Sequence, residues 1–151
     1  MPKLKVNGRS HDVAAPDETL LLFVLRNDLQ LNGPKYGCGL AQCGTCIVLV
    51  DGQPVRSCVV PAGSVVGQEI TTLEGLGTIE APSRLQQAFI DEQAAQCGYC
   101  LNGMIMASQA LLSRNPKPSE QDVRHALDGN LCRCGVHNRI VRAVMRASRE
   151  A

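Results

Sequence analysis

Eight cysteines in a chain of 151 residues limit the possible folds more than any other feature. They form two sets of four: Cys38, Cys43, Cys46 and Cys58, followed by Cys97, Cys100, Cys132 and Cys134. Four disulfides in a secreted protein would be one explanation, but Cys132 and Cys134 are too close in sequence for easy bridging. Residues 1–8 also lack the apolar stretch of a secretory signal, so we expect a cytoplasmic protein whose thiols stay reduced. The two sets therefore predict metal ligation.

Composition and charge exclude several other classes of protein. The hydrophobic content of 44% can supply a core, but aromatic residues make up only 3%, and small domains with lean cores often depend on metals. The net charge is +1 and no basic run or aromatic-interleaved patch is present, so nucleic acid is not an expected partner. The longest apolar run covers residues 20–25, which is too short for direct membrane insertion.

The first set is spaced like an iron–sulfur site. Cys38-x4-Cys43-x2-Cys46 is the spacing of plant-type ferredoxins, in which four thiolates hold one [2Fe–2S] cluster, and Cys58 supplies the fourth thiol. Glycines at positions 37, 39 and 44 flank these cysteines and would let backbone N–H groups wrap around a negatively charged cluster. A structural zinc site with four cysteines is the alternative, but the glycine-rich x4 loop fits iron–sulfur better.

The second set combines Cys97-x2-Cys100 with Cys132-x-Cys134, and each pair precedes a predicted helix. One helix is expected to open at Asn102 and the other to contain Ile140. If all four thiolates bind one cluster, both helix N-termini point toward it and stabilise its negative charge. A thioredoxin-like redox pair at Cys97 and Cys100 is the alternative, but it needs a βαβ context that this region lacks.

Hydrophobic periodicity divides the chain into residues 1–76 and residues 77–151. In the first part, strands are expected over residues 3–6, 11–14, 46–50, 55–60 and 69–73, with hairpin turns at Asn7-Gly8 and at residues 51–54. Residues 20–29 predict a short buried helix, with Asp17 or Thr19 as its N-cap. A small mixed sheet with one helix is compatible with a β-grasp ferredoxin arrangement.

The second part reads as a helical domain behind a linker at residues 75–82. Apolar residues recur at helical spacing around Leu85, Met104, Val123 and Ile140, and Ser119-x-x-Asp122 resembles a capping box. Four such segments predict a four-helix bundle. The expected fold class is therefore α+β, with a plant-type ferredoxin-like domain followed by a helical [2Fe–2S] domain.

Both cysteine sets together resemble the small iron–sulfur subunit of molybdenum hydroxylases, the family of xanthine oxidase and aldehyde oxidoreductase. The resemblance covers nearly the whole chain and is carried by KYGCGLAQCGTC at residues 35–46, RSC at 56–58, QCGYC at 96–100 and GNLCRCG at 129–135. Within the family the chain is most similar to bacterial two-component N-heterocycle hydroxylases. That resemblance implies hydroxylation of nicotinate with oxygen from water, with isoquinoline or an aldehyde as alternative substrates.

The resemblance also implies roles for matching positions. The cluster on the second cysteine set would lie next to the pterin of a molybdopterin cofactor, in its cytosine dinucleotide form, bound by a separate large subunit. Gln96 would hydrogen-bond the pterin, and Cys134 would be the ligand nearest to it. The first cluster would pass electrons outward to a c-type cytochrome or an FAD-containing acceptor, and any membrane association would come through a partner. Residues 136–139 depart from commoner family versions, so the role of His137 stays open.

No grouping of carboxylates or of Ser, His and Asp indicates a catalytic site in this chain. Its expected work is electron transfer within a heteromeric complex. A free-standing ferredoxin-type carrier is the rival interpretation, but a carrier needs only the first domain. A structural metal protein is a third, and the glycine-lined loop disfavours it.

Overall fold

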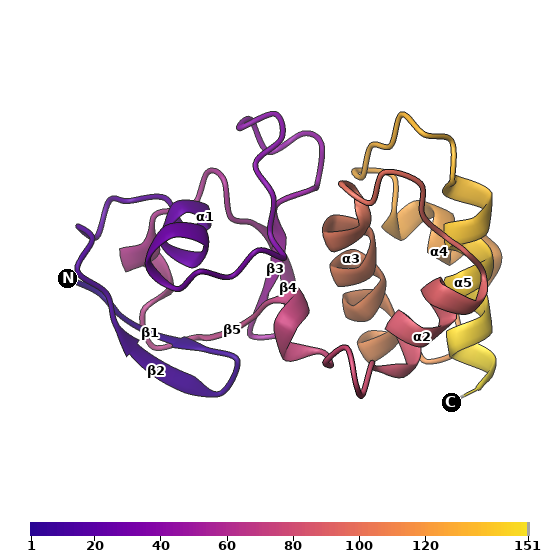
Figure 1. Cartoon of the computed structure of the whole chain (residues 1–151), viewed down its shortest axis with the longest axis horizontal. Coiled ribbons are helices and arrows are strands. Elements are labelled where there is room, and N and C mark those ends of the chain that lie inside the picture. The colour runs from indigo at the N-terminus through magenta and orange to yellow at the C-terminus, as the bar shows by residue number, and fades with distance from the viewer. Residues whose placement is uncertain (151) are drawn as a thin grey trace.

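The structure is a computed structural model, and it describes residues 1–150. Figure 1 shows a sheet-containing half that carries the N-terminus beside a helical half that carries the C-terminus. The predicted α+β class, a mixed sheet followed by a helical bundle, is confirmed. Among the residues described, no helix is both long and apolar enough to cross a membrane.

The first half is built on a five-stranded mixed sheet with the strand order β2-β1-β5-β3-β4. Its strands are β1 Lys3–Val6, β2 Arg9–Asp12, β3 Ile47–Val50, β4 Gln53–Arg56 and β5 Glu69–Thr71. Strands β1 and β5 pair in parallel and the other neighbours are antiparallel. The parallel pair brings the first strand beside the last one and closes the domain.

Strands β2 and β4 both start two residues earlier than predicted because the turns before them are tighter than expected. Asn7 and Gly8 both take positive φ, so Val6 pairs with Arg9 and β2 starts two residues earlier than predicted. Asp51 and Gly52 form the same kind of turn, and β4 therefore covers Gln53–Arg56 instead of residues 55–60. Pro54 is tolerated there since β4 lies at the edge of the sheet.

The short buried helix predicted over residues 20–29 is present, but its predicted N-cap is wrong. The chain forms one α-helical turn, α1 Leu21–Phe23, and then a π-helix over Val24–Asp28. The N-cap is Leu20, without a side-chain cap hydrogen bond. Leu20 is extended and bridges to Pro61, so the helix begins only after that tie. Asp17 accepts a hydrogen bond from the Met1 amino group (3.2 Å) instead of capping the helix.

Strand β3 is apolar on both faces because it serves two cores. Val48 and Val50 join the core of the sheet half, whereas Ile47 and Leu49 pack with the helices. A strand buried on both faces reads as a continuous apolar run, as residues 47–50 do. The two halves therefore share a packed junction.

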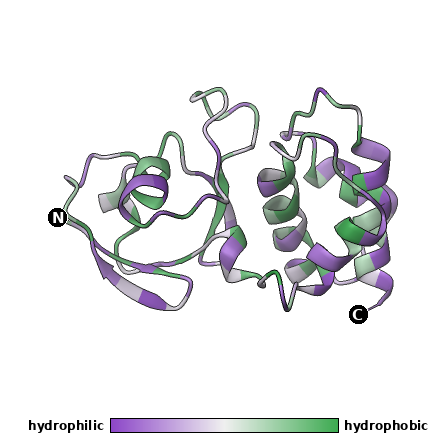
Figure 2. Cartoon of the chain, viewed as in Figure 1, coloured by the Kyte–Doolittle hydropathy of each residue, from purple (hydrophilic) through white to green (hydrophobic). Residues whose placement is uncertain are grey.

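The four helices of the second half are α2 Arg84–Asp91, α3 Leu101–Arg114, α4 Glu120–Ala126 and α5 His137–Arg149. The Ser119–Asp122 capping box is confirmed, and a second box joins Ser83 to Gln86 at the start of α2. Helix α3 is buried over most of its surface because it packs on β3 as well as on the other helices. Figure 2 shows its apolar surface in the middle of the molecule, while α5 exposes a polar outer face.

Candidate iron–sulfur centres

The first cysteine set begins in a loop that folds around the sulfur of Cys38. The backbone N–H groups of Leu40, Gln42 and Cys43 each donate to Cys38 Sγ over 3.3 Å. Gly39, Ala41 and Gly44 take positive φ, which turns these N–H groups inward. The three N–H donors hold the pKa of the Cys38 thiol at about 6, below its ordinary value of 9.0. The loop is therefore shaped to stabilise a thiolate.

Glycine is needed at position 37 for a different reason than at positions 39 and 44. Its φ is not positive, but an added Cβ would lie 2.7 Å from Cys43 Sγ. The expectation that glycines permit a close wrap around the sulfurs agrees with this geometry. Ala41 takes a left-handed conformation at a non-glycine residue, which the sequence did not indicate.

The other two thiols of the first set lie inside the protein. Cys46 directly precedes β3 and Cys58 follows β4, and both are buried in contact with Leu22. Burial raises the pKa of Cys46 to about 11. A free thiolate is costly in such a place unless a cation holds it. The buried pair thus favours metal ligation.

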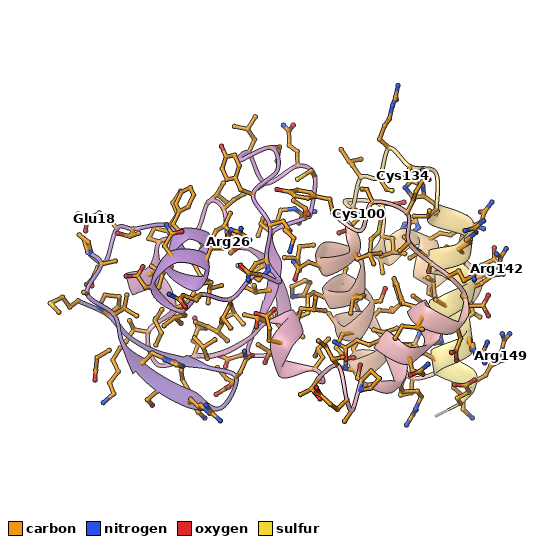
Figure 3. The ribbon with its side chains drawn as sticks, in the orientation of Figure 1. Glu18, Arg26, Cys100, Cys134, Arg142 and Arg149 are labelled. Carbon is orange, nitrogen blue, oxygen red and sulfur yellow. The ribbon has the colours of Figure 1, made fainter. Side chains whose placement is uncertain are left out.

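The second set lies where two helices begin (Figure 3), with Cys100 directly before α3 and Cys134 three residues before α5. Burial raises the pKa of Cys100 to about 12. Burial also opposes ionisation of Cys132, but the hydrogen bond from Cys100 and backbone N–H groups of residues 134–136 outweigh it and lower the pKa of Cys132. Helix α3 begins one residue before the predicted Asn102, and α5 contains Ile140 as predicted.

The thiols of each set lie near one another. Cys38 is close to Cys43, and Cys46 is close to Cys58 and Cys43. Cys100 is close to Cys132 and Cys97, and Cys134 is close to Cys97 and Cys132. Across residues 1–150, no group of three or more His, Cys, Asp or Glu side chains is placed to hold a metal ion. A tetrahedral zinc ion takes all four thiolates at one point, whereas a two-iron cluster takes two thiolates on each iron. The donor set therefore fits one [2Fe–2S] cluster for each set of four cysteines.

The two cysteine loops lie directly against each other. Leu131 N–H donates to Cys43 O (3.0 Å), and the Thr45 hydroxyl donates to Tyr99 O (2.8 Å). The Tyr99 hydroxyl also donates to Tyr36 O. Each of these bonds joins the loop of the first set to a loop of the second.

The other residues singled out in the sequence are placed as follows. Gln96 and its neighbour Cys97 are exposed, so their side chains are accessible to a partner. Lys35 and Arg56 bind backbone carbonyls, Lys35 at Gly33 O (3.2 Å) and Arg56 at Gly129 O (3.2 Å). His137 is the first residue of α5.

Sequence reasoning missed three polar residues at the junction between the loops. Thr45, Asn102 and Asn130 are all buried. Asn102 is the one that carried a signal, because it interrupts an otherwise apolar helix start between Leu101 and Met104. A polar side chain in such a position points to a specific partner.

Comparison with known proteins agrees with this geometry. Residues 4–73 match a family described as "2Fe-2S iron-sulfur cluster binding domain", and residues 72–145 match one described as "[2Fe-2S] binding domain". The chain is 61% identical over 145 residues to a subunit of nicotinate dehydrogenase from Pseudomonas putida, covering 96% of this chain and 92% of that protein. The chain belongs to the iron–sulfur small subunits of molybdenum hydroxylases.

In other members of the family this chain matches either a separate small subunit or a small part of a longer chain. It is 49% identical to the alpha subunit of isoquinoline 1-oxidoreductase from Brevundimonas diminuta, over 97% of this chain and 96% of that protein. It superposes on quinoline 2-oxidoreductase from Pseudomonas putida 86 with a TM-score of 0.93 and 35% identity, covering 98% of this chain and 93% of that chain. In aldehyde oxidoreductase from Desulfovibrio gigas the match has a TM-score of 0.93 and 41% identity, covering 97% of this chain but 16% of that one.

These relatives confirm the family, the fold and the electron-transfer role that the cysteine pattern predicted. The relatives that it matches are small subunits of larger enzymes, and in aldehyde oxidoreductase the match covers only a small part of a longer chain. When bound, each [2Fe–2S] cluster accepts and passes on one electron at a time.

Proposed function

We propose that this chain relays electrons from the molybdopterin centre of a large subunit that hydroxylates nicotinate with oxygen from water. The observation that carries the proposal is the 61% identity, over nearly the whole chain, to a subunit of nicotinate dehydrogenase. Isoquinoline or an aldehyde is the alternative substrate, because relatives with those names are 49% and 38% identical. The substrate pocket belongs to the large subunit in each case.

The proposal assigns one cluster to each cysteine set and one set to each domain. Cys38, Cys43, Cys46 and Cys58 hold the first cluster, in a domain formed by residues 1–76. Cys97, Cys100, Cys132 and Cys134 hold the second, in a domain formed by residues 77–151. The proximity of the thiols within each set supports this assignment, and so does the inward turn of the N–H groups around Cys38.

The second set faces the large subunit in this proposal. Gln96 hydrogen-bonds the pterin, of the cytosine dinucleotide form, and Cys134 is the ligand nearest to it. The exposure of Gln96 and Cys97 and the two helix N-termini beside the thiols support this orientation.

The first set faces the acceptor, a c-type cytochrome or an FAD-containing protein. Tyr36 and Leu40, which flank Cys38, are 50% and 66% exposed and offer an apolar contact for it. We place the complex in the cytoplasm, where thiols stay reduced before the clusters are loaded, with any membrane association made through a partner.

The protein's own groups do two things in this function. Backbone N–H donors around Cys38 stabilise negative charge on the exposed side of the first set. Burial of Cys46 and Cys58 beneath Leu22 keeps water from the other side. Both effects tune the reduction potential of a bound cluster.

The test is to tag the chain in its native host, purify the assembled complex, and assay nicotinate-dependent reduction of an artificial acceptor dye. Turnover by a complex that contains a molybdenum-bearing large subunit is the expected result. A complex of that composition without nicotinate turnover would move the proposal to another heterocycle or to an aldehyde. A lone iron–sulfur protein would instead favour the free-standing carrier.

A further inference from the structure

One buried side chain ties the two cysteine sets together. Asn102 is 3% exposed, and its Nδ2 donates to Thr45 O over 2.9 Å and to Ile47 O over 3.0 Å. Those two carbonyls stand on either side of Cys46, and Asn102 itself follows Cys100 by two positions. The carboxamide therefore links the first turn of α3, just after Cys100, to the backbone on both sides of Cys46.

Two more bonds repeat this pattern at neighbouring positions. The Thr45 hydroxyl donates to Tyr99 O, directly before Cys100. Leu131 N–H, directly before Cys132, donates to the carbonyl of Cys43 itself. All of the ties therefore attach within two residues of a cysteine in each set.

The backbones at this junction are in close contact. A Cβ added to Gly103 would lie 2.0 Å from Gly44 O. Gly44 takes φ +80°, and a Cβ there would lie 2.5 Å from Asn130 Oδ1. Helix α3 thus presses its first turn on the loop of the first set, with no side chain between the two backbones.

Asparagine at position 102 lowers the stability of the fold, which indicates that the residue is kept for a function. Asparagine lowers helix stability relative to leucine or methionine. Within the described residues its Oδ1 is buried without a hydrogen-bond partner, which costs further free energy. Local violations of this kind concentrate at functional positions.

We propose that Asn102 is a positioning residue that fixes the distance between the two cluster-binding loops and so the rate of electron transfer between them. The proposal rests on the ligand sets assigned above. In each transfer one electron leaves the cluster on the second set, which is oxidised, and reduces the cluster on the first set. Because the rate of such a transfer falls steeply with distance, a tie at Cys46 and Cys100 governs it directly.

The test compares three variants of the assembled complex. Asn102→Leu removes both carbonyl bonds and keeps the number and branching of the side-chain heavy atoms, and Thr45→Val removes only the bond to Tyr99 O. Ser108→Ala is the matched control: Ser108 is fully buried in the same helix and its hydroxyl has no partner among the described residues. Each complex is reduced with sodium dithionite, so no heterocyclic substrate is needed.

The readout is the magnetic interaction between the two reduced clusters, seen as splitting of their EPR signals at low temperature. We expect Asn102→Leu to keep both signals and the full iron content but to lose the splitting, and Thr45→Val to weaken it. A separate single-turnover experiment, started with the substrate of the complex instead of dithionite, should show slower reduction of the first cluster in Asn102→Leu. Ser108→Ala should match the wild type in every measurement.

Wild-type splitting and transfer rate in both Asn102→Leu and Thr45→Val would overturn the proposal. If Asn102→Leu fails to retain its clusters, Thr45→Val alone decides the matter. A wild-type complex without two separate signals would instead contradict the assigned ligand sets. Failure of nicotinate as substrate leaves the EPR measurement unaffected, since dithionite supplies the electrons there.

Discussion

Replacing Gly103 by alanine tests the close contact between α3 and the first cysteine loop. The new Cβ would lie 2.0 Å from Gly44 O and 2.7 Å from Gly44 C, both of them backbone atoms. A backbone cannot turn aside as the end of a flexible side chain can, so α3 or the loop has to shift. The nearby Asn130 Oδ1, at 2.9 Å, blocks one direction of movement.

Two opposing free energies decide the sign of the effect. Alanine in a helix is more favourable than glycine by about 0.5–1 kcal/mol. Overpacking costs about 1–3 kcal/mol, and a contact this short with backbone belongs at the upper end, about 3 kcal/mol. The expected net loss is therefore about 2 kcal/mol, which lowers the unfolding midpoint by about 4–8 °C for a chain of this size.

The assay is the thermal bleaching of the visible iron–sulfur absorption in the purified complex, at one fixed scan rate. Ser113→Ala is the control, because Ser113 is exposed on the same helix and the change should stay within about 0.5 kcal/mol. A Gly103→Ala midpoint equal to or above that of the wild type would refute the reasoning. It would mean that the helix and the loop are not pressed together as the structure has them.

Three further predictions address the ligands, a helix cap and a charge pair. Cys134→Ser should impair transfer from molybdenum and leave the EPR signal of the ferredoxin-like cluster intact; loss of both signals would contradict the division into two domains. Ser83→Ala removes the cap of α2, which Ser83 Oγ makes with Gln86 N–H (3.2 Å), and should lower stability by about 1 kcal/mol in thermal unfolding; an unchanged midpoint would argue that α2 is held by packing alone. The hydrogen bond from Lys5 holds the pKa of Glu69 below its ordinary 4.5, so this carboxylate stabilises the fold above that pH and loses its effect as the pH falls through the lowered pKa. The wild type should therefore unfold at a higher temperature than Glu69→Gln near neutral pH, and the difference should vanish in acid; a difference that persists in acid would point to another cause.

Features set by residues close together in sequence were predictable. The loop around Cys38 closes within a few residues, so the spacing of its cysteines and glycines carries most of its geometry. The capping box of Ser119 and Asp122 spans one helical turn and forms as predicted. The same holds for the four helical segments, whose apolar periodicity reflects the core that they bury.

Contacts between distant segments overrode local preferences elsewhere. Residues 20–29 have the apolar pattern of a helix, but the bridge from Leu20 to Pro61 delays its start, and the remainder winds as a π-helix. The pattern therefore predicted the buried helix correctly and its N-cap wrongly. The shift of β4 has a local cause instead, because the positive φ values of Asp51 and Gly52 set the register of the hairpin.

The sequence alone determined that the chain binds two iron–sulfur clusters in two domains, since cysteine spacing and helix periodicity are properties of short segments. Only the tertiary structure decided how the two sites meet. Asn102 reaches carbonyls 57 and 55 positions away, and Thr45 bonds a carbonyl 54 positions away. A buried carboxamide in the sequence indicates that hydrogen-bond partners are needed, but it does not identify them. The packing of β3 against α3 determines which carbonyls lie within reach of Asn102.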